Sequence, residues 1–201
     1  YDAIQRESKG LYRVNVGGKA NANGRIVGGQ WGLVDSAGHV LIKPQYADIQ
    51  RVSKGLYKVN VGGEPERYGR IVGGQWGLVN SVGKVLINPL YDDIQSVAKG
   101  LYRVQVGSKA NAVGRIVGGQ WGLVDSLGKV VIEPQYDAIL GEPKGLSWVV
   151  QVGRKPNKNG DLVGGQWGLV DSLGKVIIKA QYDALFRASK CCYWVQVGGK
   201  P

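Results

Sequence analysis

One histidine and one recurring carboxylate are the side chains best suited to acid–base chemistry in this sequence. His39 stands where the corresponding positions of later segments have Lys84, Lys129 and Lys175. A catalytic base would not be exchangeable for lysine, so we interpret His39 as an exposed residue at the start of a strand. The sequence has no His, Cys and carboxylate cluster at metal-ligand spacing, no nucleophile motif and no phosphate-binding loop. We therefore expect no enzyme activity, no cofactor and no metal.

The recurring carboxylates could pair for glycosidase chemistry, in which two carboxyl groups flank the scissile bond. They open the motif Asp-Ser-x-Gly at Asp35, Asp125 and Asp171, and Asn80 takes the same place in another copy. Asp and Asn both hydrogen-bond their own backbone in turns. A turn role is therefore favoured over catalysis.

Four tryptophans, each followed by glycine and preceded by glutamine, could form a repeated platform for a sugar. They are Trp31, Trp76, Trp121 and Trp167. Neighbouring residues of a strand point to opposite faces, so each Gln and Trp cannot line one pocket unless the strand is distorted. The favoured interpretation is a large ring that packs in the core over its neighbouring glycine. A sugar-binding platform is the alternative.

A row of cations and amides follows a period of two along one strand of each segment. The row consists of Arg13, Asn15, Lys58, Asn60, Arg103 and Gln105. Residues two apart share one face of a strand, so stacked copies would form a ladder of cation and amide. Such a ladder would suit a repetitive polyanion, and a solvated β face without a ligand is the alternative.

These residues recur because the chain is a tandem repeat. The Trp-Gly steps follow one another at intervals of 45, 45 and 46 residues. The spacing predicts a single repeat domain, with units at 1–45, 46–90, 91–135 and 136–181 and a partial unit at 182–201.

Each unit has the pattern of three to four short antiparallel strands. Apolar and polar residues alternate over 11–16, which predicts a strand. The Asp-Ser-x-Gly step predicts a hairpin turn with glycine in the left-handed region. The pair Gly28-Gly29 indicates a bulge or a close backbone approach, and Pro44 ends its strand or marks an edge. Helical spacing is not present over ten or more residues.

The motif of each unit resembles the WG-containing (KWG) repeat family. It is carried by Gly-Gln-Trp-Gly-Leu-Val-Asp-Ser-x-Gly at 29–38, Pro-x-Tyr-x-Asp-Ile at 44–49 and Lys-Gly-Leu-Tyr-x-Val at 54–59. The resemblance covers nearly the whole chain, and the chain departs from it in a longer Gly-Gly-Lys-x-Asn-x-x-Gly connection. It implies a β-repeat region for binding or scaffolding and no particular reaction.

The repeats could be arranged in two ways, as an open twisted β array or as a closed β-propeller. A unit of about 45 residues with four strands has the size of a propeller blade. The half-unit that opens each repeat occurs five times, and the Trp-Gly half occurs four times. A closed ring would need complementary end pieces, whereas duplicate ends supply a cap at each end of an open stack. The open array is favoured.

The composition of the chain limits the classes of partner that we expect it to bind. The net charge of +11 favours polyanions such as nucleic acid or an anionic glycan, although the same charges could only keep a glycine-rich β protein soluble. No stretch is apolar enough for a membrane helix. The chain lacks Met and begins with Tyr1, so we expect a mature or trimmed fragment. An extracellular or cell-surface location is favoured.

The partial unit at the C-terminus carries an apolar cluster that other units lack. Its members are Phe186, Cys191, Cys192 and Trp194. Enrichment of this kind predicts an assembly interface, with burial against the preceding repeat as an equal alternative. We expect a non-enzymatic scaffold that binds or self-assembles, and the alternative is a lectin-like protein that binds carbohydrate, anionic glycans included.

Overall fold

In the computed structural model, the chain folds into antiparallel β-strands grouped in two compact units, Tyr1–Ile94 and Gln95–Pro201. We keep the word unit for these two parts and call each tandem copy a repeat. The structure describes residues 1–66, 70–98, 100–110, 116–141, 147–158, 160–189 and 192–198.

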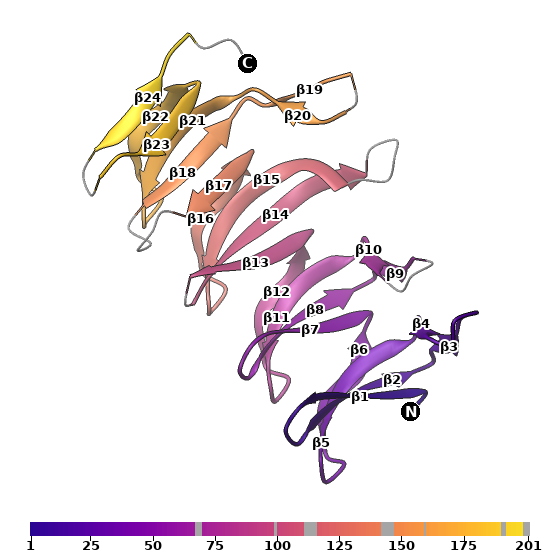
Figure 1. The fold of residues 1–201 in the computed structure, drawn as a ribbon. Helices are drawn as coiled ribbons and strands as arrows, with labels where there is room; N and C mark the ends of the chain where they lie inside the picture. The colour runs from indigo at the N-terminus through magenta and orange to yellow at the C-terminus, as the bar shows by residue number, and fades with distance from the viewer. Residues whose placement is uncertain are drawn as a thin grey trace. The chain divides into compact units, whose positions relative to one another are not determined.

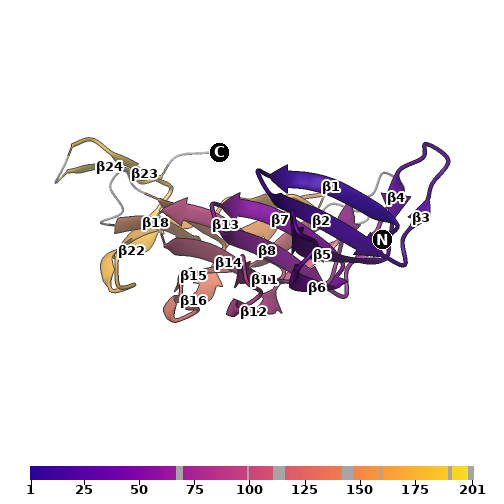
Figure 2. The same cartoon turned by 90° about the horizontal axis from the view of Figure 1, so that it is seen from below.

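The first unit contains two four-stranded sheets (Figure 1). The first sheet has the order β1-β2-β5-β6 and comprises β1 (Ala3–Ser8), β2 (Leu11–Val16), β5 (Gln30–Asp35) and β6 (Val40–Tyr46). The second has the order β7-β8-β11-β12 and comprises β7 (Asp48–Ser53), β8 (Leu56–Val61), β11 (Gln75–Asn80) and β12 (Val85–Tyr91). Two-residue strands form small hairpins between the second and third strands of each sheet, and the first of them is clear in Figure 2. They are β3 (Lys19–Ala20) with β4 (Ile26–Val27), and β9 (Glu64–Pro65) with β10 (Ile71–Val72).

The second unit continues the same design with two four-stranded sheets and a terminal hairpin. The third sheet comprises β13 (Asp93–Ala98), β14 (Leu101–Ala110), β15 (Ile116–Asp125) and β16 (Val130–Tyr136). The first two residues of β13 belong to the first unit. The fourth comprises β17 (Ala138–Gly141), β18 (Ser147–Val152), β21 (Gln166–Asp171) and β22 (Val176–Tyr182), with the small hairpin of β19 (Lys155–Pro156) and β20 (Leu162–Val163). The terminal hairpin pairs β23 (Ala184–Arg187) with β24 (Tyr193–Gln196).

The predicted fold class is confirmed. The described residues contain strands and turns and no helix, and four strands form each of the four main sheets. None of the sheets closes on itself. No helix in the described part of the chain is long and apolar enough to cross a membrane.

Each sheet has two faces of different composition, because its strands alternate. We call the side with the Trp-Gly tryptophan the tryptophan face and the opposite side the valine face. In the first sheet the tryptophan face carries Arg13, Asn15, Trp31 and Leu33, and the valine face carries Ile4, Tyr12, Val14 and Val34.

The sheets of a unit pack with the tryptophan face of one against the valine face of the next. In the first unit, Leu33 and Ile42 of the first sheet form one buried cluster with Ile49, Tyr57 and Val79 of the second. This contact buries apolar surface on both sides, which a single sheet could not do alone.

The second unit repeats this packing twice. Leu123 and Ile132 of the third sheet pack against Ile139 and Trp148 of the fourth. The fourth sheet in turn packs its tryptophan face against the hairpin, where Leu185 is buried.

The Asp-Ser-x-Gly turns form as predicted. Asp35 Oδ1 accepts hydrogen bonds from the backbone N–H groups of Ala37 and His39, both at 2.9 Å. Asn80, Asp125 and Asp171 accept the equivalent pairs of bonds. The side-chain oxygen at this position is therefore used in the turn, as the exchange of Asp for Asn indicates.

The glycine after each tryptophan is required by the strand that follows. The pairing of β11 with β12 shifts between Trp76 and Leu78, so the β12 backbone bulges toward Gly77. A Cβ added at Gly77 would lie 2.5 Å from Ile87 O and 2.7 Å from Pro89 N. The other Trp-Gly glycines have the same two backbone neighbours. The Trp-Gly pair is thus a packing requirement of the bulge.

Gly77→Ala should lower the free energy of unfolding by about 3 kcal/mol, because both neighbours are backbone atoms that cannot swing away. Urea unfolding followed by circular dichroism measures the change. Gly24→Ala is the control, since its Cβ meets nothing within 4 Å although φ is +71°. We expect the control to cost about 1 kcal/mol for the left-handed conformation. Equal losses in the two variants would contradict the steric explanation.

Candidate functional site

The cation of the second repeat links its own tryptophan to the strand that follows. Lys58 Nζ lies 4.1 Å from the centroid of the Trp76 ring and 2.5 Å from Asp93 Oδ1. The ammonium group thus has an aromatic face on one side and a carboxylate on the other. Both interactions are electrostatically favourable in a partly desolvated position.

The arginines of the first and third repeats make the same kind of link between stacked sheets. Arg13 lies 5.6 Å from the Trp31 ring and donates from Nη1 to Ile49 O of the second sheet at 2.7 Å. Arg103 lies 4.7 Å from the Trp121 ring and donates from Nη1 to Ile139 O of the fourth sheet at 3.0 Å. Each guanidinium therefore joins one sheet to the next.

The amides of the row lie beneath the surface. Asn15 and Asn60 are fully buried and Gln105 is 8% exposed. Each donates from its side-chain nitrogen to the carbonyl of the first glycine in the Gly-Gly pair of its own sheet. The accepting residues are Gly28, Gly73 and Gly118, at 3.1, 3.2 and 2.7 Å.

The prediction that these cations and amides form a solvent-facing ladder is therefore wrong. Polar and apolar residues alternate on the strand, but a neighbouring sheet covers the polar side as well. The amides hold the Gly-Gly pair, whose two glycines both have positive φ as the predicted close approach requires. The cations hold successive sheets together.

The tryptophans lie between sheets, as the packing interpretation predicts. Trp76 is buried, and Trp31, Trp121 and Trp167 are half-buried against the core clusters of their sheets. The adjacent glutamines are exposed on the opposite face, so the predicted Gln-Trp pair does not form a pocket. Trp121 differs from the others because it also lines a cleft.

The fourth repeat replaces the cation with an apolar residue. Val149 takes the register position of Arg13, opposite Leu169 instead of Leu33. It is buried with Leu169 and Leu185 in the cluster beneath the terminal hairpin. The last stacking contact is thus apolar where earlier ones contain a charge.

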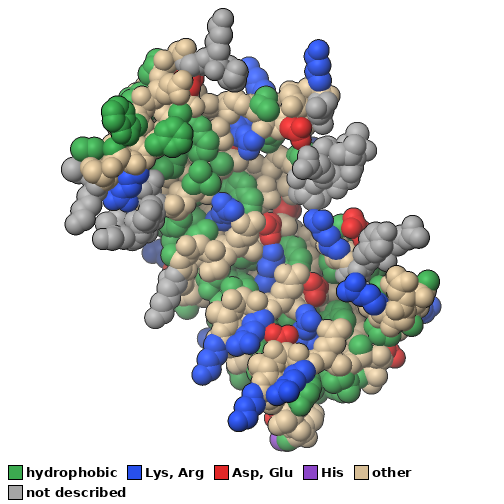
Figure 3. Space-filling model, viewed as in Figure 1, with side chains coloured by type: hydrophobic (Ala, Val, Ile, Leu, Met, Phe, Trp, Pro, Cys, Tyr) green, Lys and Arg blue, Asp and Glu red, His purple; other side chains and the backbone are tan. Residues whose placement is uncertain are grey.

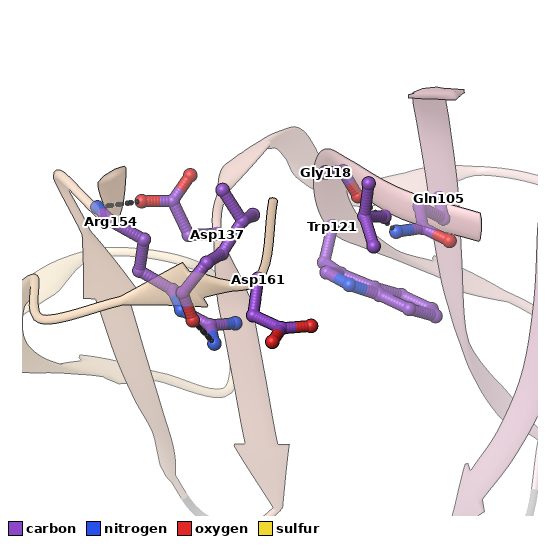
Figure 4. A pocket seen from close by; sticks show the side chains of 8 residues that line it. Gln105, Gly118, Trp121, Asp137, Arg154 and Asp161 are labelled. Atoms are coloured by element: carbon purple, nitrogen blue, oxygen red, sulfur yellow. Dashed lines mark hydrogen bonds between the residues drawn. The ribbon is translucent and has the colours of Figure 1, made fainter. Parts of the chain in front are cut away.

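A polar cleft of about 350 Å³ lies in the second unit between the third and fourth sheets (Figure 4). The third sheet supplies Gln105, Val117, Gly118 and Trp121. The opposite wall comes from segments of the fourth repeat that flank its sheet, with Asp137 before β17, Arg154 before β19, Asp161 before β20 and Leu162 at the start of β20. In Figure 4, Asp161 lies between the Arg154 side and the Trp121 side of the cleft.

The polar groups of the cleft are held in place by the backbone. Asp137 Oδ2 accepts from the backbone N–H of Arg154 at 2.8 Å, and the Arg154 guanidinium donates to Leu162 O. Gln105 is fixed by its bond to Gly118 O. The lining combines one aromatic ring with two carboxylates, one guanidinium and one amide, which can hold a polar ligand without metal or redox chemistry of its own.

Sequence reasoning missed three residues of this cleft, although a signal was present. Asp161 replaces the arginine that earlier repeats have at Arg25 and Arg70, and Arg154 replaces Gly18 and Gly63. Asp137 keeps the aspartate that other repeats have at Asp2 and Asp92, and Ala47 is the exception. The two departures from the repeat, Arg154 and Asp161, mark this segment as unusual, although the sequence alone does not bring them to Trp121.

The remaining titratable groups have structural roles. The Asp35 side chain hydrogen-bonds His39 Nδ1 at 2.8 Å, and this bond lowers the pKa of Asp35. His39 itself is exposed, as predicted. Burial raises the pKa of Tyr57, Tyr102 and Tyr136. Among the described residues, no three His, Cys, Asp or Glu side chains gather to hold a metal ion.

The apolar cluster of the terminal hairpin lies on its outer side. Phe186 and Trp194 are cross-strand partners, 66% and 71% exposed, and they occupy the tryptophan face. Figure 3 shows hydrophobic side chains gathered over this hairpin. Cys192 is exposed, and Cys191 lies outside the described residues. Burial of Phe186 and Trp194 against the preceding repeat is thereby excluded.

Comparison with known proteins gives one match. The family described as WG containing repeat matches residues 31–64, 76–109, 121–153 and 167–200, each match beginning at a Trp-Gly tryptophan. No curated protein and no solved structure matches the chain.

Lys58→Met should lower the free energy of unfolding by about 1–3 kcal/mol, because it removes the ion pair with Asp93 and the contact of the charge with Trp76. Chemical unfolding of the purified chain measures this loss. Lys54→Met is the matched control, since Lys54 is exposed. A loss no larger than that of the control would show that Lys58 does not link the strands.

The length of the amide side chain, Asn or Gln, should be energetically coupled to the size of the residue three positions later in the chain. A Cβ at Gly63 would lie 2.4 Å from Asn60 Oδ1, whereas the third repeat combines Gln105 with Ser108. Gly63→Ser alone should cost about 1–3 kcal/mol of stability as an overpacking change. The double variant Asn60→Gln with Gly63→Ser, which copies the third repeat, should recover about half of this loss. Strictly additive effects in the double-mutant cycle would contradict the coupling.

Proposed function

The chain belongs to the WG-containing repeat family, and on this premise we propose that it is a non-enzymatic scaffold that self-assembles by stacking copies end to end. The C-terminal hairpin of one copy would pack on the first sheet of another. The observation that carries the proposal is that Trp194 is 71% exposed, whereas Val149 at the same register position is 6% exposed and Lys58 is partly buried. The exposed Phe186 lies beside Trp194.

The donor surface is the tryptophan face of the terminal hairpin. Trp194 has the register position of Arg13 and Phe186 has that of Gln5, because both pairs lie directly across their hairpins. In the first sheet Arg13 bonds to Ile49 O of the second sheet, whereas Gln5 is exposed. An apolar pair at this place favours packing against another sheet over solvation.

The acceptor surface is the valine face of the first sheet. Ile4 is 63% exposed, whereas its counterparts Ile49 and Ile139 are 0% and 1% exposed beneath the preceding sheets. Tyr12 is likewise less buried than Tyr57. The first sheet therefore offers the surface that packs on a tryptophan face within each unit.

The two surfaces are complementary and lie on different parts of the chain. An interface of this kind is heterologous, and copies joined through it form rings or filaments according to the rotation between them. The same stacking contact that holds sheets together within a unit would be continued between copies. The cations of the row are used between sheets, so this proposal does not depend on a polyanion.

Light scattering after size-exclusion chromatography should show the mass of the chain rising with concentration. Phe186→Gln with Trp194→Lys introduces the residues of the second repeat, Gln50 and Lys58, and should leave a monomer at every concentration. Ile4→Lys should have the same effect from the opposite surface.

The control is Leu173→Ala, which removes another exposed apolar side chain and copies Ala37 of the first repeat. This variant should assemble like the original chain. A strict monomer before any substitution, or assembly that survives the Phe186 and Trp194 changes, would reject the proposal.

A further inference from the structure

We propose that the cleft between the third and fourth sheets is a binding site for a neutral sugar residue of hexose size. The inference is independent of self-assembly, because no residue of the terminal hairpin lines the cleft. It assigns a ligand to a place where the packing of the third sheet with the fourth repeat leaves a cleft.

The size of the cleft suits a small ligand. Its volume of about 350 Å³ falls within the usual range of small-molecule sites. One wall comes from the third sheet and the other from segments that flank the fourth sheet, and the cluster around Leu123, Ile139 and Trp148 packs these two sheets together. A ligand would therefore meet a site that is largely formed before it binds.

The charges of the lining disfavour an anion, because the carboxylates of Asp137 and Asp161 outnumber the Arg154 guanidinium. Carboxylates accept hydrogen bonds and the guanidinium donates them, so together they match hydroxyl groups that do both. A neutral polyol can bond to both kinds of group without bringing a further charge into the cleft.

The aromatic wall distinguishes a sugar from a simpler polyol. Arg103 lies over the Trp121 ring, and the part of the indole that remains lines the cleft. The C–H groups of a pyranose ring can pack against an indole while its hydroxyls reach the polar wall. Gln105 lies directly across the strand pair from Trp121 and adds an amide to this wall.

The comparison with the first unit shows that these polar groups are not needed for stacking. Between the first and second sheets, the positions of Asp137, Arg154 and Asp161 are held by Ala47, Gly63 and Arg70. Those sheets pack with the same core and the same amide contacts. Arg154 and Asp161 therefore change the polar wall relative to the first unit. Asp137 also has a structural role, because it accepts a backbone hydrogen bond as Asp2 does in the first repeat.

The test is titration of the full chain with glucose, galactose, mannose and N-acetylglucosamine, followed by calorimetry and ligand-detected NMR. At least one sugar should bind saturably. Each free sugar is compared with its methyl glycoside. Preference for the free sugar identifies a free sugar as the ligand, and preference for the glycoside identifies the end of a glycan. Both results support the proposal.

Two variants remove the polar wall with residues that sister repeats already tolerate. Asp161→Arg copies Arg70 and Asp137→Ala copies Ala47. Each should weaken the affinity roughly tenfold or more, which corresponds to about 1.4 kcal/mol. Asp171→Asn is the matched control, since it removes a carboxylate of the fourth sheet outside the cleft and copies Asn80. Its affinity should be unchanged.

The proposal fails if none of the four sugars binds, or if Asp161→Arg binds as well as the original chain. It also fails if methylguanidinium or acetate binds in the cleft and the sugars do not. The Phe186→Gln with Trp194→Lys variant should keep the full sugar affinity, so loss of assembly and loss of sugar binding are separate outcomes.

Discussion

Within each compact unit, the fold depends on the burial of the tryptophan face of one sheet by the valine face of the next. A sheet of this chain has a tryptophan face and a valine face, and it can bury neither by itself. In the first unit, Leu33 and Ile42 obtain a buried environment only because Ile49 and Tyr57 of the next sheet cover them. Repetition is therefore the source of stability, as in other arrays whose units contact only their nearest neighbours.

This constraint explains why charged residues occupy the middle of a packing surface. The charged groups of Lys58 and Arg103 lie over the tryptophan ring of their own sheet. Their charged ends reach a carboxylate or a carbonyl of a later strand. A contact of this kind is directional, so it fixes the register of one strand against the next in a way that aliphatic packing alone does not.

The residues that differ between repeats lie at the two surfaces for which we propose a function besides sheet packing. Val149 replaces the cation and gives an apolar contact beneath the hairpin, and Trp194 carries that change to an exposed face. Arg154 and Asp161 change the wall of the cleft in the fourth repeat. The repeated residues are used by the fold, whereas the proposed assembly and the proposed sugar site both rest on residues that differ between repeats.

The sequence by itself determined the features that arise from local chemistry. Alternation over 11–16 gave the strand, Asp35 and Gly38 gave the hairpin turn, and the spacing of the tryptophans gave the repeat, because each depends on residues close together in the chain. Only the tertiary structure decided which faces are buried. Asn15 is polar and alternates with valines, so the local pattern predicts solvent, yet it is fully buried and its amide bonds to Gly28 O of its own repeat. The cleft was beyond the sequence for the same reason, since Asp137 and Asp161 are far apart in the chain and meet Trp121 only when two sheets pack.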